Sequence, residues 1–232
     1  IVPLVTISNP SNNVQLTCDS TDIDVVAQGA TSYLWEEATI GVVGNSAAYT
    51  ISNPGVYSVT GALSNGCFSE AFITVSENVD APTASIQNNT GNQTELTCQL
   101  DTISLTANGG VAYSWSNGVT VVSSDADFIA GTPGVYTVTV TALNGCVDTA
   151  SVIISSDGSA PIAAIAIPSG VDTLTCAITN TILQASGGSS YAWSNGGDQA
   201  ILNVDEPGVY TVTVTAANGC SASTSVEIFA DT

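Results

Sequence analysis

The stretch "PGVYTVTVTALNGC", Pro133 to Cys146, decides the fold of this chain. Valine alternates with threonine along it, which is the period-2 pattern of a strand with one buried face. The stretch ends in Asn144-Gly145, a pair favoured in tight hairpin turns because both residues accept a positive φ. We therefore predict a strand, a tight turn and a returning strand in "CVDTASVII".

This strand and turn occur three times. The other copies are "PGVYSVTGALSNGC", residues 54–67, and "PGVYTVTVTAANGC", residues 207–220. The tryptophans Trp35, Trp115 and Trp193 are spaced by 80 and 78 residues. This period is longer than that of solenoid repeats and suits a small domain that folds by itself. We predict three domains, residues 1–79, 80–157 and 158–232, and call these segments the first, second and third repeat.

Each repeat has the pattern of a β-sandwich, with short strands and a turn signal about every ten residues. In "DTISLTANGG" the inward positions of the alternating strand are Ile103, Leu105 and Ala107. No segment carries a sustained helical period. The expected fold class is all-β, with three tandem immunoglobulin-like sandwich domains that form an extended rod.

The aromatic residues of each repeat resemble those of an immunoglobulin-like domain. Trp115 stands where strand C carries its buried tryptophan, and Tyr136 stands where strand F begins with its corner tyrosine. Val138 occupies the position of the second cysteine of an antibody domain, so the usual disulfide between strands B and F is missing. We expect the equivalent aromatic residues to lie in the cores: Trp35, Trp115, Trp193, Tyr57, Tyr136 and Tyr210.

The composition excludes several classes of function. The 232 residues include no Lys, Arg or His and 20 Asp and Glu, which gives a formal charge of −20. Nucleic acid is excluded as a partner because no cation neutralises phosphate, and anionic membranes are disfavoured by the same sign. No apolar run reaches the ~18 residues of a membrane span. The 44% of hydrophobic residues nevertheless suffices to fill folded cores.

The sequence also lacks the residues of a catalytic site. A nucleophilic triad needs a base, and there is no His or Lys. The neighbouring carboxylates Glu36-Glu37 and Asp205-Glu206 would point to opposite faces of a strand. We expect no enzyme and no cofactor. Three acids near the domain ends are weak candidates for Ca²⁺, with diffuse counter-ions as the favoured alternative: Glu77, Asp80 and Asp157.

The six cysteines occupy two positions in each repeat, one in "LTC" before strand B and one in "NGC" after strand F. In an immunoglobulin topology these positions lie at opposite ends of the sandwich, separated by roughly 23 Å. A disulfide needs Cα atoms within roughly 4.4–6.8 Å. Tandem stacking instead brings the "LTC" end of one domain to the "NGC" end of the next. We expect interdomain bonds Cys18–Cys146 and Cys98–Cys220, with Cys67 and Cys176 bonded to neighbouring domains or free.

Pairing within each repeat is the open alternative: Cys18–Cys67, Cys98–Cys146 and Cys176–Cys220. Bonds between domains would lock the joints of a stiff rod, whereas bonds within domains would leave beads on a string. The linkers "SENVDAP" and "SSDGSAP" are short, and Pro82 and Pro161 restrict their backbones, which favours the rod. Regularly spaced cysteines also indicate an oxidising, extracellular setting.

The strings "YSWSNG" and "PGVYTVTVTALNGC" closely resemble repeats of the giant surface adhesins of Bacteroidota, the SprB-type gliding-motility proteins. The first repeat is the poorest match, because "YLWEEA" replaces "YSWSNG" and Gly61 interrupts its F strand. The resemblance implies a protein that is secreted by the type IX system and displayed as a filament on the cell surface. It also implies O-glycosylation at Asp-Ser/Thr sequences, for which the candidates are Ser20, Thr102, Thr149 and Thr173.

These observations predict a structural role. We expect a stalk segment of a cell-surface adhesin, a mechanical spacer in attachment or gliding whose partners are further repeats and the secretion and motility machinery. Because the sequence starts without Met or the basic flank of a signal peptide, we take it as a piece of something longer. The alternatives are a module that binds glycan or protein through its loops, and a subunit of a polymerised fibre.

Overall fold

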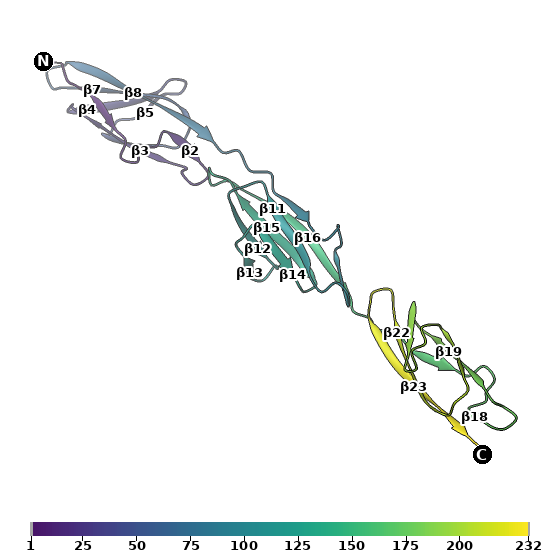
Figure 1. Ribbon diagram of the computed structural model, residues 1–232. Coiled ribbons are helices and arrows are strands. Elements are labelled where there is room, and N and C mark those ends of the chain that lie inside the picture. Colours follow the sequence, from purple (N-terminus) through teal and green to yellow (C-terminus); the bar gives the residue numbers. More distant parts are fainter. Residues whose placement is uncertain (1, 232) are drawn as a thin grey trace. The chain divides into compact units, whose positions relative to one another are not determined.

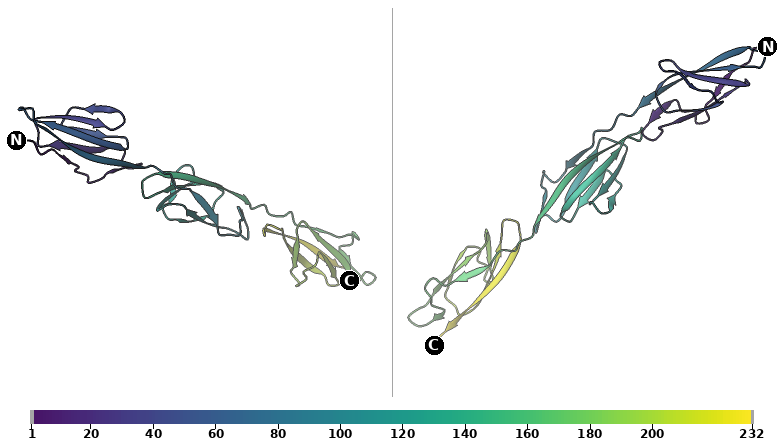
Figure 2. Two further views of the ribbon diagram at one scale, coloured as in Figure 1. Left: turned by 90° about the horizontal axis from the view of Figure 1, so that it is seen from above. Right: turned by 180° about the vertical axis from the view of Figure 1, so that it is seen from behind.

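The computed structural model describes residues 2–231. All the regular secondary structure in that range consists of β-strands (Figures 1 and 2). The all-β fold class is therefore confirmed. No helix of this range is long and apolar enough to cross a membrane. The chain forms two compact units, one with residues up to Ile86, Ala107–Ala126 and Thr137–Ala150, the other with Gln87–Thr106, Asp127–Tyr136 and the residues from Ser151 on. The second repeat contributes to both units, and the division into three domains stays a prediction.

The first repeat contains a small sheet with the strand order β1-β3-β6 and a large sheet with the order β2-β8-β7-β4-β5. In immunoglobulin terms these are strands A, B and E, and strands A′, G, F, C and C′. The bounds of the strands are β1 (Thr6–Ser8), β2 (Gln15–Thr17), β3 (Ile23–Gln28), β4 (Ser32–Glu37), β5 (Gly41–Gly44), β6 (Ala48–Ile51), β7 (Gly55–Ala62) and β8 (Phe68–Asn78).

The second repeat has the same strand order, with sheets β14-β11-β9 and β10-β16-β15-β12-β13. Its strands are β9 (Ser85–Asn88), β10 (Glu95–Thr97), β11 (Ile103–Asn108), β12 (Ala112–Ser116), β13 (Val121–Ser123), β14 (Asp127–Ala130), β15 (Gly134–Thr141) and β16 (Val147–Asp157).

The third repeat has a small sheet β17-β19-β21 and a large sheet of four strands, β18-β23-β22-β20. Its strands are β17 (Ala164–Ala166), β18 (Thr173–Leu174), β19 (Thr181–Ser186), β20 (Ser190–Trp193), β21 (Ile201–Val204), β22 (Gly208–Thr215) and β23 (Ser221–Ala230).

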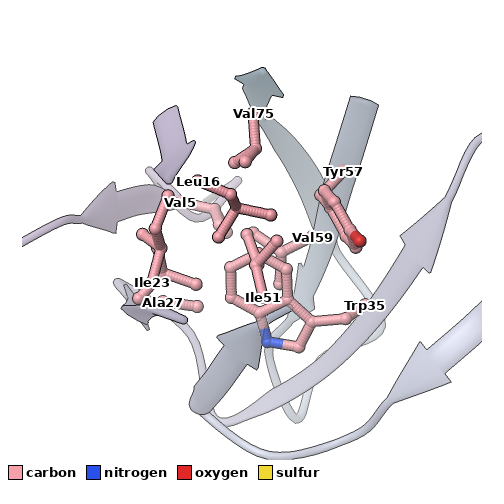
Figure 3. Packing of buried hydrophobic residues seen from close by; sticks show 10 residues of the cluster. Val5, Leu16, Ile23, Ala27, Trp35, Ile51, Tyr57, Val59 and Val75 are labelled. Atoms are coloured by element: carbon pink, nitrogen blue, oxygen red, sulfur yellow. The ribbon is translucent and has the colours of Figure 1, made fainter. Parts of the chain in front are cut away.

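The core of the first repeat lies between its two sheets (Figure 3). Alternation on β3 buries Ile23, Val25 and Ala27, while β4 supplies Trp35 and β7 supplies Val59. Trp35 and Val59 are fully buried, so the valine at the vacated cysteine position fills the core with a β-branched side chain. The other repeats bury the equivalent residues: Trp115 and Val138, and Trp193 and Val212.

The corner tyrosine of each repeat bonds back to the loop before its own strand. The Tyr57 hydroxyl donates to the Asn53 carbonyl at 3.0 Å, and Tyr136 donates to Thr132 at 2.9 Å. Tyr210 donates to the carbonyl of Glu206 at 2.9 Å but is only half-buried. Since this bond spans four residues in each copy, it is the tyrosine corner that the sequence predicts at the start of strand F.

In each large sheet, the strand that comes first in the sequence pairs in parallel with the strand that comes last in the sequence. Strand β2 pairs with β8 so that Thr17 lies opposite Asn78, and β10 pairs with β16 so that Thr97 lies opposite Asp157. In the third repeat β18 pairs with β23 in the same way. The parallel register places the cysteine that follows Thr17 or Thr97 beside the start of the linker to the next repeat.

Candidate functional site: two disulfide junctions

The "NGC" turn, which we call the head, has the same hydrogen bonds in all three repeats. In the second repeat, the Gly145 N–H donates to the Ala142 carbonyl at 3.0 Å, and the Ala142 N–H donates to the Cys146 carbonyl at 2.8 Å. The Asn144 Oδ1 atom accepts the Cys146 N–H at 3.1 Å. Asn65 and Asn218 accept the N–H of the following cysteine at 3.1 and 3.0 Å.

One detail of the predicted turn is wrong. The pair Asn144-Gly145 was expected to place both residues at positive φ, but only Gly145 does so, at +77°. Asn12 and Asn92 are the only residues other than glycine with positive φ among residues 2–231. Asn144 therefore has its role in the side chain, which closes the turn through Oδ1 and leaves its Nδ2 donors pointing outward.

The "LTC" loop, which we call the foot, also repeats. In the first foot the Thr17 N–H donates to the Ser20 carbonyl at 2.9 Å, and the Thr17 Oγ1 atom accepts the Ser20 N–H at 3.1 Å. Thr97 and Thr175 make the corresponding bonds with Leu100 and Ile178. Each foot is thus a closed loop that presents its cysteine outward.

At the first junction, Cys18 of the first foot is bonded to Cys146 of the second head, with Cα atoms 4.9 Å apart. The Cys18 N–H donates to the Asn144 carbonyl at 3.1 Å. The Asn144 amide donates to the linker, to Oδ1 of Asn78 at 3.0 Å and to the carbonyl of Asp80 at 3.0 Å. The head is therefore attached to the foot and to the linker beside it.

At the second junction, Cys98 is bonded to Cys220, with Cα atoms 5.0 Å apart. The Asn218 amide donates to the carbonyls of Asp157 and Ser159 at 3.3 and 3.0 Å. Hydrogen bonds from the Ser159 N–H, the Ser159 hydroxyl and the Asn218 amide lower the pKa of Asp157. Both disulfides are the pairs expected from the sequence, and no bond within a repeat forms among the described residues.

Sequence reasoning missed the asparagine amides. The signal was present, because all three heads end in Asn-Gly-Cys. Hairpin rules explain that pair through the backbone alone, so they give no reason to look for a side-chain donor.

The two remaining cysteines form no disulfide with any residue that the structure describes. Cys67 in the first head is half-buried, and Cys176 in the third foot is exposed. Cys67 is at the head position that Cys146 and Cys220 occupy in the two junctions. Cys176 is at the foot position that Cys18 and Cys98 occupy.

The Ca²⁺ candidates do not come together. Glu77 is exposed on β8, Asp80 contributes its carbonyl to the first junction, and Asp157 belongs to the second junction. Within residues 2–231 no group of three acidic, cysteine or histidine side chains is placed to hold a metal ion.

The two pairs of neighbouring carboxylates lie in different settings. The buried carboxylate of Glu37 accepts bonds from the Thr39 hydroxyl and N–H, which lower its pKa, while Glu36 lies half-buried on β4. Asp205 and Glu206 are exposed in the loop before β22. The Glu37 carboxylate is thus occupied by its own turn.

The glycosylation candidates lie in different settings. Thr102 and Thr149 are exposed, on the loop before β11 and on β16. Ser20 in the first foot and Thr173 on β18 are half-buried. Their modification stays a prediction.

No protein-family model and no curated protein matches this sequence. Among solved structures, a 1.5-MDa bacterial ice-binding adhesin aligns over 100% of this chain and 99% of its own, with 14% identity and a TM-score of 0.49. The fibronectin(III)-like modules of Clostridium thermocellum CbhA align over 66% of this chain and 95% of their own, with 14% identity and a TM-score of 0.34. Murine CEACAM1b aligns over 66% of this chain and 100% of its own, with 12% identity and a TM-score of 0.32.

Proposed function

We propose that this chain is a load-bearing stalk segment of a secreted cell-surface adhesin, which spaces the adhesive end from the cell and transmits tension. The observation that carries this proposal is the position of the disulfides. Each bond joins the foot of one repeat to the head of the next, directly beside the linker that already connects them. A joint that is held at two points resists swivelling, which a peptide linker alone allows.

The parallel strands add a second mechanical feature. Because β2 and β8 run parallel, a pull on the two ends of the first repeat acts along both strands in opposite directions. The hydrogen bonds between them are then sheared together instead of being opened one after another. The same geometry recurs in β10 with β16 and in β18 with β23.

The surface location rests on the resemblance to the gliding-motility adhesins. Under this proposal the chain is exported by the type IX system, and its partners are further repeats and the motility machinery. The candidate serine and threonines, Ser20, Thr102, Thr149 and Thr173, carry O-glycans. The charge of −20 then keeps neighbouring stalks apart by repulsion.

Single-molecule stretching between the chain ends tests the proposal. With both disulfides intact, the shortest covalent path runs to Cys18, crosses to Cys146, returns to Cys98 and crosses to Cys220. At about 3.5 Å per extended residue this path reaches roughly 270 Å, against roughly 800 Å for the reduced chain. The double variant Cys67→Ser/Cys176→Ser serves as the starting protein, because it keeps both junctions and removes thiols that would reshuffle them.

We expect the oxidised chain to reach its shorter limit and to yield at higher force than the chain reduced by a phosphine. Yielding at the same force in both states would contradict a load-bearing role. A glycan array tests the alternative that the chain is a glycan-binding module. A spacer should give no binding signal on the array.

A further inference from the structure

Among the described residues, the two cysteines that form no disulfide are Cys67 in the first head and Cys176 in the third foot, each of which is one half of a junction. We propose that the head of the first repeat docks on the foot of the third repeat of a second copy of this chain, closing a Cys67–Cys176 disulfide. The inference rests on the proposed function, because it uses the same junction to connect two chains. Its test measures a disulfide between chains and does not measure resistance to force.

The first head already has the conformation of a docked head. Asn65 accepts the Cys67 N–H through Oδ1, as the asparagines of the two docked heads do. Gly66 has the same positive φ, +80° against +77° for Gly145. Docking therefore requires no refolding of the turn.

In the part of the chain that the structure describes, no residue bonds the Asn65 amide of this head or lies beside its Gly66. The Asn65 amide group has no partner among residues 2–231, whereas the amides of Asn144 and Asn218 bind a linker. A Cβ atom on Gly66 would meet nothing within 4 Å, but one on Gly145 would lie 2.0 Å from Asp19 of the opposing foot. The donors that hold a docked head are thus present and unused.

The third foot matches the foot of the second junction. Its Thr175 closes the loop as Thr97 does, which leaves the Cys176 thiol exposed. A hollow of about 420 Å³ beside Cys176 corresponds to one of about 280 Å³ beside Cys98, with leucine, threonine, cysteine and proline at equivalent lining positions. Asp157 ends β16 opposite Thr97, and Asp231 directly follows β23 at the equivalent place beside Thr175. The Asp231 carbonyl therefore stands at the position of a known acceptor.

The covalent step needs an oxidant, for which we name a small-molecule disulfide such as oxidised glutathione. The Cys176 thiolate attacks glutathione disulfide, forms a mixed disulfide and releases one glutathione thiolate. The Cys67 thiolate of the second chain then attacks the Cys176 sulfur and releases the other. Two protein thiols are oxidised and one glutathione disulfide is reduced to two glutathione molecules, whose thiolates take up the two protons that the protein thiols lose.

The test mixes two variants of the full chain. Cys67→Ser retains only the foot thiol, and Cys176→Ser retains only the head thiol. In a glutathione redox buffer with about 0.5 M salt, which shortens the reach of the repulsion between two acidic chains, we expect the mixture to form a dimer at least tenfold faster than either variant alone. Mapping with an acid-side protease should find Cys67 bonded to Cys176.

Specific docking is tested by Asn65→Asp in the Cys176→Ser chain. The variant keeps the Oδ1 acceptor of the turn and removes both amide donors, so we expect the dimer to form several-fold more slowly. Asn117→Asp is the matched control, because Asn117 closes a surface turn through its Oδ1 atom and lies in no junction. It should leave the rate unchanged.

Equal rates for the mixture and the single variants would overturn the proposal, and so would equal rates for Asn65→Asp and Asn117→Asp. Either result would leave the stretching experiment, and hence the proposed function, untouched.

Discussion

The two junctions use the same connection in different surroundings. Both join a foot cysteine to a head cysteine, and in both an asparagine amide bonds the linker. The first adds a backbone bond from Cys18 to Asn144, for which the second has no equivalent among the described residues. The third residue of the first linker is the neutral Asn78, and the third residue of the second linker is the acidic Asp157.

This difference separates what the connection requires from what it tolerates. The disulfide and the asparagine donor are present in both junctions, while the residues that accept the donor vary. The acceptors are mostly backbone carbonyls, which every residue supplies, so the linker sequence is free to change. A connector of this kind can be repeated along a chain whose linkers diverge.

The largest expected effect comes from removing either disulfide. Cys18→Ala/Cys146→Ala and Cys98→Ala/Cys220→Ala should each lower the free energy of unfolding of the joined repeats by about 2–4 kcal/mol, because the unfolded chain gains entropy. The bonds span 128 and 122 residues, so the two losses should agree closely. Guanidinium denaturation followed by tryptophan fluorescence measures both. A clear inequality would show that the local contacts matter more than the cross-link.

The strands and cores could be predicted from sequence because alternation reports burial directly. Ile103, Leu105 and Ala107 are buried as their spacing requires. The parallel pairing of β2 with β8 could not be predicted from sequence, since "QLT" has three residues and is too short to show an alternation of buried and exposed positions. The expected disulfides followed from topology, because strands B and F fix the ends of the sandwich at which the cysteines lie.

The asparagine contacts escaped prediction for a physical reason. Whether the Asn144 amide finds an acceptor depends on the linker of another repeat, 66 residues away in sequence. Local rules describe only the turn itself, in which Asn65, Asn144 and Asn218 behave alike. The three turns differ in whether the foot of another repeat lies opposite the asparagine. This depends on the tertiary structure and not on the local sequence.

The second expected effect comes from Asn144→Asp and Asn218→Asp. Each keeps the turn acceptor, removes the donors and sets a carboxylate against carbonyl oxygens, at a cost of about 1–3 kcal/mol. Asn218→Asp should cost more at neutral pH, because Asp157 then faces a second negative charge. Denaturation and hydrogen exchange of the linker amides measure both. Asn65→Asp is the control and should cost little, so an equal loss there would contradict the role in the junctions.

A smaller effect is expected when the head glycines are replaced. Gly66→Ala, Gly145→Ala and Gly219→Ala all place alanine at φ near +80°, which costs about 1 kcal/mol in each. In the docked heads the new methyl group would also lie 2.0 Å from Asp19 or 2.1 Å from Gln99, so these side chains must move. We expect the two junction variants to lose about 1 kcal/mol more than Gly66→Ala in thermal or chemical denaturation. Three equal losses would mean that the head–foot contact is loose.

The smallest expected effect is a pH dependence that only the second junction has. Its hydrogen bonds hold the pKa of Asp157 below the ordinary 3.8, so the ionised carboxylate favours the folded junction. This contribution is present above pH 3.8 and is lost as the pH falls through the lower, folded pKa. Asn78 at the same place in the first junction does not titrate.

We therefore expect phosphine reduction of Cys98–Cys220 to accelerate between pH 5 and pH 2.5 by about twofold relative to Cys18–Cys146, since the carboxylate is partly exposed and its interactions are screened. Comparing the two bonds within one molecule cancels the effects of pH that the two junctions share. Asp157→Asn should remove the difference, because it gives the second linker the asparagine that the first linker has at the same position. A pH dependence that survives this substitution would place its origin elsewhere in the acidic surface, and the contrast between the junctions would then not rest on their linkers.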